Sequence, residues 1–136
     1  MPALTPGDAQ DILATYKRGW EKRDPDTIMA LFSDHALFRA DPFVDDLQGV
    51  NAIRVYWNEF CASSANVEFD AERTWAAGST VLASWHGAYT RRSTSERVRV
   101  RGFLTMELAE DRLIQRYRQW SIERSVGTDS TFGSEE

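Results

Sequence analysis

The spacing of apolar residues changes once along this chain of 136 residues, near residue 65. Before that point, apolar residues recur every three or four positions, which is the spacing of one helix face. After it, apolar and polar residues alternate, which is typical of strands with one buried face. We therefore predict an α+β domain in which helices come first and then cover one face of a sheet.

Three helices are expected in the first half of the chain. Thr5-Pro6 can begin the first, because the threonine hydroxyl can cap the helix and proline suits its first position. Asp24-Pro25 repeats this signal for a short second helix, and Gly49 precedes a third helix near residues 50–62. The intervening residues 35–47 are expected to be irregular or to form a short strand.

Four antiparallel strands at hairpin spacing are expected in the second half. They cover residues 66–76, 80–90, 97–108 and 112–122. Helices on one face of a curved sheet leave a cavity unless side chains fill it. We predict one domain over residues 1–124 and a polar tail over residues 125–136 that lacks fixed structure.

Charge and composition narrow the class of protein. The chain holds 16 basic and 21 acidic residues, and residues 91–124 alone hold 9 arginines against 5 acids. The net charge of −5 argues against a nucleic-acid partner. No stretch approaches the roughly 20 apolar residues that span a membrane. With a single cysteine, Cys61, and no signal pattern at the start, we expect a cytoplasmic protein.

Five short motifs occur in a characteristic order. They are Tyr16, Leu31-Phe32-Ser33-Asp34-His35-Ala36, Asp41-Pro42, Gly49 with Ala52-Ile53-Arg54, and Tyr117-Arg118-Gln119-Trp120. In this order the chain resembles the SnoaL-like and ketosteroid-isomerase-like branch of the nuclear transport factor 2-like superfamily. The resemblance implies a cone-shaped α+β fold, with three N-terminal helices packed on a curved, mainly antiparallel sheet that encloses a pocket.

The resemblance implies several possible activities, because members include isomerases, polyketide cyclases, dehydratases, epoxide hydrolases and proteins without catalysis. By motif, Asp41 matches a general base and Tyr16 matches a donor to an oxyanion. Ketosteroid isomerase has a second hydrogen-bond donor to the oxyanion, and Leu104 stands at the matching position here. We expect a cofactor-independent isomerase, cyclase or lyase acting on a small carbonyl-containing metabolite. The alternative is a non-catalytic small-molecule-binding protein or a dimeric interaction protein.

The expected pocket is apolar and suits a flat, polyketide-like molecule. The residues expected to bind it are Trp20, Phe38, Trp57, Trp85, Trp120 and Arg118. The resemblance places Trp120 inward, and alternation then places Arg118 inward as well. A buried arginine requires a carboxylate or a ligand anion, and Asp41 is one possible partner. The alternative for each aromatic residue is simple core packing.

The outer face of the predicted sheet carries opposite charges on two strands. Glu68, Asp70 and Glu72 form an acidic stripe, and Arg97, Arg99 and Arg101 form a basic one. Two such stripes can be complementary about a two-fold axis, so we expect a homodimer through this face, which also carries Phe103 and His86. The alternative is a solvated surface whose charges pair within one chain. Two histidines and one cysteine form no metal motif, so no metal or cofactor is expected.

Overall fold

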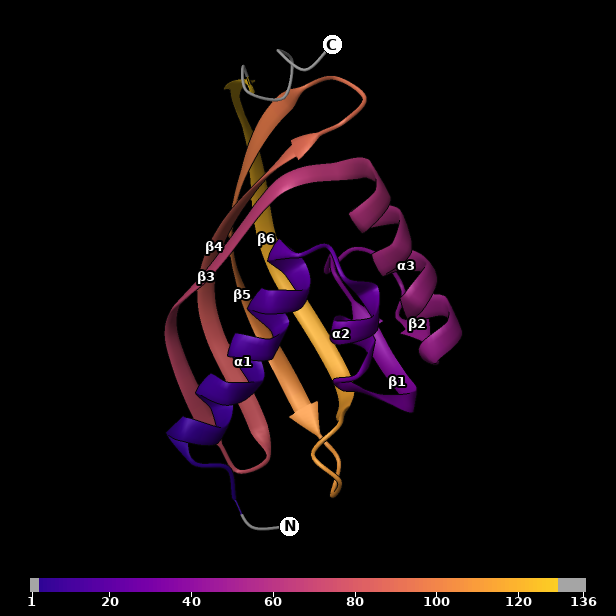
Figure 1. The fold of residues 1–136 in the computed structure, drawn as a ribbon. Coiled ribbons are helices and arrows are strands. Elements are labelled where there is room, and N and C mark those ends of the chain that lie inside the picture. Colours follow the sequence, from indigo (N-terminus) through magenta and orange to yellow (C-terminus); the bar gives the residue numbers. More distant parts are fainter. Residues whose placement is uncertain (1–2, 130–136) are drawn as a thin grey trace.

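The computed structural model describes residues 3–129, which form three helices and one six-stranded sheet (Figure 1). In chain order these elements are α1 (Pro6–Glu21), α2 (Pro25–Met29), β1 (Phe32–Arg39), β2 (Leu47–Gln48), α3 (Val50–Ser63), β3 (Ser64–Ala77), β4 (Thr80–Arg91), β5 (Glu96–Leu108) and β6 (Ile114–Thr128). The predicted α+β fold, with helices before a mainly antiparallel sheet, is confirmed.

The strands lie in the order β2-β1-β6-β5-β4-β3. Neighbours pair in an antiparallel way except β1 and β6, which are parallel. All three helices lie on one side of the curved sheet, with α1 across the long strands and α3 beside β1 and β2 (Figure 1). We call the side that carries the helices the inner face and the other side the outer face.

The helices begin where their capping residues predict. The Thr5 hydroxyl accepts a 3.1 Å hydrogen bond from the Asp8 backbone N–H, and the Asp8 carboxylate accepts a 3.0 Å bond from the Thr5 N–H. This reciprocal pair satisfies two backbone donors that the helix leaves free. Gly19 then allows α1 to approach α2, because a Cβ at this position would lie only 2.5 Å from a side-chain carbon of Ile28.

Two β-bulges determine which side chains reach the inner face. On β6, Ile114 pairs with Leu108, but Arg116 pairs with Glu107, so Gln115 is an extra residue. The alternation changes phase there, and Tyr117 follows Ile114 as the next buried residue. A second irregularity in β3, between Ala71 and Arg73, changes the phase of that strand in the same way.

The last strand is longer than its sequence predicts. The expected strand stopped at residue 122, whereas β6 continues to Thr128. Residues 125–128, which we assigned to the tail, therefore pair with the start of β5, for example Thr128 with Glu96. Residues 130–136 of the expected tail lie outside the described residues. Within residues 3–129, no helix combines the length and apolar character needed to cross a membrane.

Candidate functional site

A pocket of about 640 Å³ opens beside the loop that follows β1. Its wall comes from the end of β1, this loop, β2, α3 and the inner face of β6. The aromatic and polar residues that line it are Phe38, Arg39, Asp41, Phe43, Asp45, Tyr56, Gln119, Ser121 and Glu123. The pocket lies at the mouth of the cone, so its contents remain in contact with solvent.

Asp41 lies in this loop, at the first turn after β1. Its Oδ1 accepts a 2.9 Å hydrogen bond from the backbone N–H of Phe43, and its carbonyl accepts one of 3.2 Å from Val44. This local turn is typical of an Asp-Pro sequence. Among residues 3–129, Asp41 has no other side-chain hydrogen bond or ion pair, and the residue is exposed. The structure thus places the predicted base in the wall of a pocket, at its solvent side.

Aromatic rings form the apolar part of the pocket. Phe38 contacts Tyr56 with ring centroids 4.9 Å apart and stacks on Tyr117 at 4.8 Å, with the ring planes only 11° apart. Tyr56 is half-buried, and burial, followed by the nearby charge of Glu123, raises its pKa to about 12. Its phenol is therefore protonated at neutral pH and can act only as a neutral hydrogen-bonding group.

The polar part of the wall comes from alternate residues of β6. Gln119 is buried, and its amide nitrogen donates a 3.0 Å hydrogen bond to the Ser121 hydroxyl oxygen. Further along, the Glu123 carboxylate accepts hydrogen bonds from Tyr89 at 3.0 Å and Arg91 at 3.1 Å. Glu123 is therefore already neutralised by Arg91, whereas Gln119 and Ser121 present polar atoms beside the rings.

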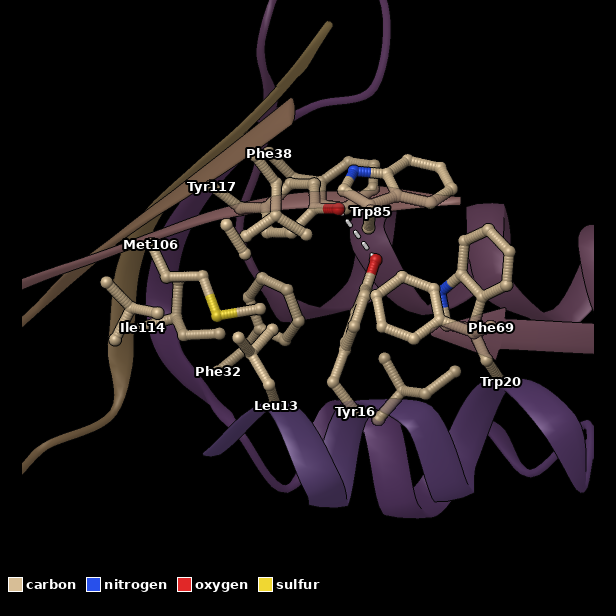
Figure 2. Close-up of a cluster of buried hydrophobic side chains, with 14 of the residues drawn as sticks. Leu13, Tyr16, Trp20, Phe32, Phe38, Phe69, Trp85, Met106, Ile114 and Tyr117 are labelled. Atoms are coloured by element: carbon tan, nitrogen blue, oxygen red, sulfur yellow. Dashed lines mark hydrogen bonds between the residues drawn. The ribbon is translucent and has the colours of Figure 1, made fainter. Parts of the chain in front are cut away.

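Tyr16, the predicted oxyanion donor, lies in the core and not in the pocket wall. Its side chain is fully buried, and its hydroxyl lies 2.7 Å from that of Tyr117 (Figure 2). Burial raises the pKa of both hydroxyls above the ordinary tyrosine value. Tyr117 in turn donates a 2.7 Å hydrogen bond to Oε1 of Gln119. Tyr16 thus reaches the pocket only through two other side chains.

The interior of the cone is filled by the aromatic residues that we expected to line a cavity. Trp20 contacts Trp85 with ring centroids 5.5 Å apart, and Phe69 packs against both (Figure 2). The ring of Trp57 lies 5.8 Å from that of Trp20. All three tryptophans are buried and none lines the pocket. Their indole N–H groups find no hydrogen-bond partner within residues 3–129. Of the expected aromatic lining, Phe38 alone reaches the described pocket.

Arg118 and Trp120 lie on the outer face, so the expectation that they point inward is wrong. The bulge at Gln115 is the physical reason, because it shifts the alternation of every later residue of β6. Trp120 lies opposite Phe103 and is 38% exposed. Arg118 is separated from the pocket by the sheet itself, and no ion pair with Asp41 forms.

The charged stripes lie on the outer face as predicted, but they pair within one chain. Arg97 contacts Glu68 across β4, and Arg101 lies 3.6 Å from Glu72. His86, on β4 between them, lies 3.1 Å from the same Glu72 carboxylate. Part of the charge complementarity expected between two copies is thus satisfied inside each one, whereas Arg99 forms no ion pair within residues 3–129. All of these pairs are at the surface, where ion pairs contribute little.

Gln119 and Ser121 are the polar pocket residues that the sequence did not identify. Both were on the face of β6 that regular alternation from Ile114 turns outward. Within residues 3–129 no group of three or more His, Cys, Asp or Glu residues is placed to hold a metal ion. The chemistry of this pocket therefore has to be argued from three carboxylates, one guanidinium, an amide, hydroxyls and aromatic rings; the charged residues are Asp41, Asp45, Glu123 and Arg39.

The fold described above agrees with the protein family whose model matches this sequence. The model of the SnoaL-like domain matches residues 12–117. The chain belongs to the SnoaL-like family. The matched segment begins in α1 and ends at Tyr117, so it includes Asp41 and stops just before Gln119. A comparison with curated protein sequences finds no match.

Solved structures of similar fold extend this SnoaL-like comparison. An epoxide hydrolase/cyclase-like enzyme, SalBIII, which takes part in pyran ring formation in the polyether salinomycin, has a TM-score of 0.77 at 20% identity, covering 90% of this chain and 97% of its own. An LEH-like epoxide hydrolase from Mycobacterium tuberculosis has a TM-score of 0.72 at 17% identity, covering 86% and 84%.

A third similar structure has a ligand bound. It is a hypothetical protein with a ketosteroid isomerase-like fold from Catenulispora acidiphila, in complex with trimethylamine. Its TM-score is 0.71 at 14% identity, covering 81% of this chain and 84% of that one. At such low identity, all three likenesses concern the fold alone.

Proposed function

We propose that this SnoaL-like protein binds a small carbonyl-containing metabolite in the mouth pocket and that Asp41 moves a proton on it. One observation carries the proposal: a carboxylate with no cationic partner and the polar groups of β6 line the same pocket from two different elements. A base and a hydrogen-bond donor around one carbonyl group are the two requirements for removing an adjacent proton.

The proposed step conserves atoms and charge. Asp41 takes a proton from the carbon next to the carbonyl and becomes a neutral carboxylic acid, while the substrate becomes an enolate. Returning the proton to another carbon completes an isomerisation. In a cyclisation the enolate carbon attacks a second carbonyl, and the resulting alkoxide takes the proton back from Asp41. In an elimination the leaving group departs with its bonding electrons, and Asp41 returns the proton to it or to water. The three reaction classes that we expected for this chain, isomerase, cyclase and lyase, share this first step.

Exchange of hydrogen for deuterium tests the shared step without knowledge of the natural substrate. Acetophenone has a methyl group next to its carbonyl, and NMR in D2O follows the loss of its protons. We expect the wild-type protein to accelerate this exchange and Asp41→Asn to reduce the acceleration about a hundredfold, as for loss of a general base. Asparagine can keep the turn to Phe43, so the fold is preserved.

A matched control separates this base from surface carboxylates in general. Asp34 is an exposed residue of β1 outside the pocket, so Asp34→Asn should leave the exchange rate unchanged. Equal exchange rates for wild type and Asp41→Asn would reject the role of Asp41.

The second candidate function is binding without catalysis. It is favoured by the exposure of Asp41 and by the filled interior, which leave the pocket open to water. Water at the site weakens the electrostatic effects on which proton transfer relies. Under this alternative, acetophenone shifts the NMR signals of pocket residues but exchanges no faster than in buffer.

We also propose that a second copy of the chain covers the outer face. Trp75 is 39% exposed, Trp120 38% and Ile122 74%, and Trp75 contacts Phe103 at 6.1 Å. Such a strip of exposed rings suits a symmetric contact, in which the same patch serves both copies. The buried Nε of Arg118 has no partner within residues 3–129, and a covering carboxylate would supply one.

The proposed location is the cytoplasm. The single cysteine, Cys61, is free and buried, which suits a reducing compartment.

A further inference from the structure

Four side chains form a continuous chain of hydrogen bonds from the core to the pocket. The Tyr16 and Tyr117 hydroxyls lie 2.7 Å apart, Tyr117 donates to Oε1 of Gln119 at 2.7 Å, and Nε2 of Gln119 donates to Oγ of Ser121 at 3.0 Å. Tyr16 and Tyr117 are fully buried, whereas Gln119 and Ser121 line the pocket. One end is therefore dry and the other open to a ligand.

The dry end determines the direction of every proton in this chain. Within residues 3–129, the Tyr16 hydroxyl has only the Tyr117 hydroxyl as a possible acceptor, and the adjacent Trp20 indole N–H can only donate. If the chain ran inward, with Tyr117 donating to Tyr16, the Tyr16 proton would be buried without an acceptor. That arrangement is disfavoured, because a buried donor without an acceptor has lost its hydrogen bonds to water and gained none. Tyr16 therefore donates to Tyr117, and Tyr117 to Gln119.

This direction fixes what the pocket wall presents. The amide oxygen of Gln119 is occupied by Tyr117, so the amide nitrogen lies on the Ser121 side. One hydrogen of this nitrogen goes to Oγ of Ser121, which leaves the second amide hydrogen and the serine hydroxyl proton to be shared with pocket contents. The wall formed by Gln119 and Ser121 thus presents hydrogen-bond donors to a ligand.

Resting on the proposed function, we infer that Gln119 and Ser121 bind the acceptor oxygen of a neutral carbonyl ligand, and that Tyr117 is the positioning residue that locks the Gln119 amide. The ring of Phe38, stacked on Tyr117, gives the ligand an apolar surface next to these donors. An ammonium group, which can only donate, would meet N–H and O–H groups at the same point and be disfavoured. The donor expected at Tyr16 is supplied instead from β6.

The direction of the chain is tested by NMR of the Gln119 side-chain amide in the ligand-free protein. If protons run outward, Tyr16→Phe leaves the Tyr117–Gln119 bond in place, and the amide signals keep their positions. Tyr117→Phe removes the donor to Oε1, and the amide signals shift. Movement of the amide signals in Tyr16→Phe as large as in Tyr117→Phe would show the opposite direction and overturn the inference.

Ligand class is tested with acetophenone and ethylbenzene, which have similar shapes but differ in the carbonyl oxygen. We expect wild type to bind acetophenone about tenfold more tightly, the factor given by one hydrogen bond of ordinary strength. Gln119→Met, which keeps the volume, should reduce this preference to about twofold or less, and Ser121→Ala should reduce it in part. Tyr117→Phe should lower the preference while leaving ethylbenzene affinity unchanged.

The possible failures are distinguishable. Equal affinity of wild type for both compounds would show that Gln119 and Ser121 do not bind the carbonyl oxygen, although the pocket would still bind a ligand. An unchanged preference in both Gln119→Met and Ser121→Ala has the same meaning. If neither compound shifts any pocket signal of wild type, the pocket itself is rejected, and the proposed function falls together with the carbonyl site.

Discussion

Tyr16 and Tyr117 are 101 positions apart in the chain and meet hydroxyl to hydroxyl at 2.7 Å in the centre of the core. Their contact joins α1 to β6 and removes two phenols from any direct contact with a ligand. Side chains also fill most of the expected aromatic cavity, because Trp57 and Trp85 both pack on Trp20. The space that remains lies at the mouth of the cone, beside Asp41.

Removing the two hydroxyls separately should have unequal effects on stability. Tyr117→Phe deprives Tyr16 of its acceptor and Gln119 of its donor, so we expect a loss of about 2–3 kcal/mol in the free energy of unfolding. Tyr16→Phe leaves the bond to Gln119 intact and should cost about 1 kcal/mol. Urea unfolding of both variants measures the difference; a larger loss in Tyr16→Phe would contradict it.

Alkaline pH should destabilise the protein through its four tyrosines. Burial is the largest cause that raises the pKa of each one, and Tyr56 reaches about 12. The unfolded chain loses these protons near pH 10, while the folded protein keeps them. The contribution of these tyrosines to stability is therefore constant below pH 10 and falls as the pH rises from 10 towards 12. Each unit of pKa difference contributes about 1.4 kcal/mol.

Ultraviolet absorption of tyrosinate checks this alkaline prediction. In the folded protein no tyrosinate signal should develop near pH 10, and ionisation should coincide with loss of the folded circular dichroism spectrum. A tyrosine that titrates near pH 10 before unfolding would show that its hydroxyl is accessible to water.

The outer face should control the oligomeric state. Trp120→Glu places a charge in the centre of the exposed aromatic strip, and we expect it to convert a dimer into a monomer by light scattering after size-exclusion chromatography. Phe43→Glu is the matched control, because Phe43 is 96% exposed but lies at the pocket loop. If wild type is monomeric, or if the Trp120→Glu variant stays dimeric, the proposal that a second copy covers the outer face is rejected.

The cap of α1 should be measurable in isolation from the pocket. Thr5→Ala removes the hydroxyl that accepts from Asp8, and we expect a loss of about 1 kcal/mol in unfolding free energy. Thr15→Ala, the same change inside α1, should have an effect within about 0.5 kcal/mol. If the two variants lose equal stability, the cap contributes nothing specific.

The order of elements could be predicted because each signal is local. Thr5-Pro6, Asp24-Pro25 and Gly49 begin the three helices as expected, and the hairpin strands follow from alternation between buried and exposed residues. Asp41 could be placed beside a pocket by its motif alone. The parallel pairing of β1 with β6 has no local signal, because it joins segments about 80 residues apart.

The pocket wall could not be predicted because one bulge decides which residues of β6 point inward. Regular alternation from Ile114 turns Gln119 outward and Trp120 inward, and neither a glycine nor a proline marks Gln115 as an extra residue. The same kind of irregularity near Ala71 moves Trp75 to the outer face. Both errors concern side-chain direction and leave the strands themselves correctly placed.

The bulge at Gln115 decides which side of β6 faces the core. Deleting this residue would remove the bulge and leave Tyr117 and Gln119 on the inner face, whereas a regular strand that keeps Gln115 would turn Trp120 and Arg118 inward. The ligand contacts and the surface contacts thus both depend on the same alternation of side chains along β6. Loss of the bulge with Gln115 kept in the strand would alter what the protein binds and what it associates with together, while substitutions of single wall or surface residues change only one of them at a time.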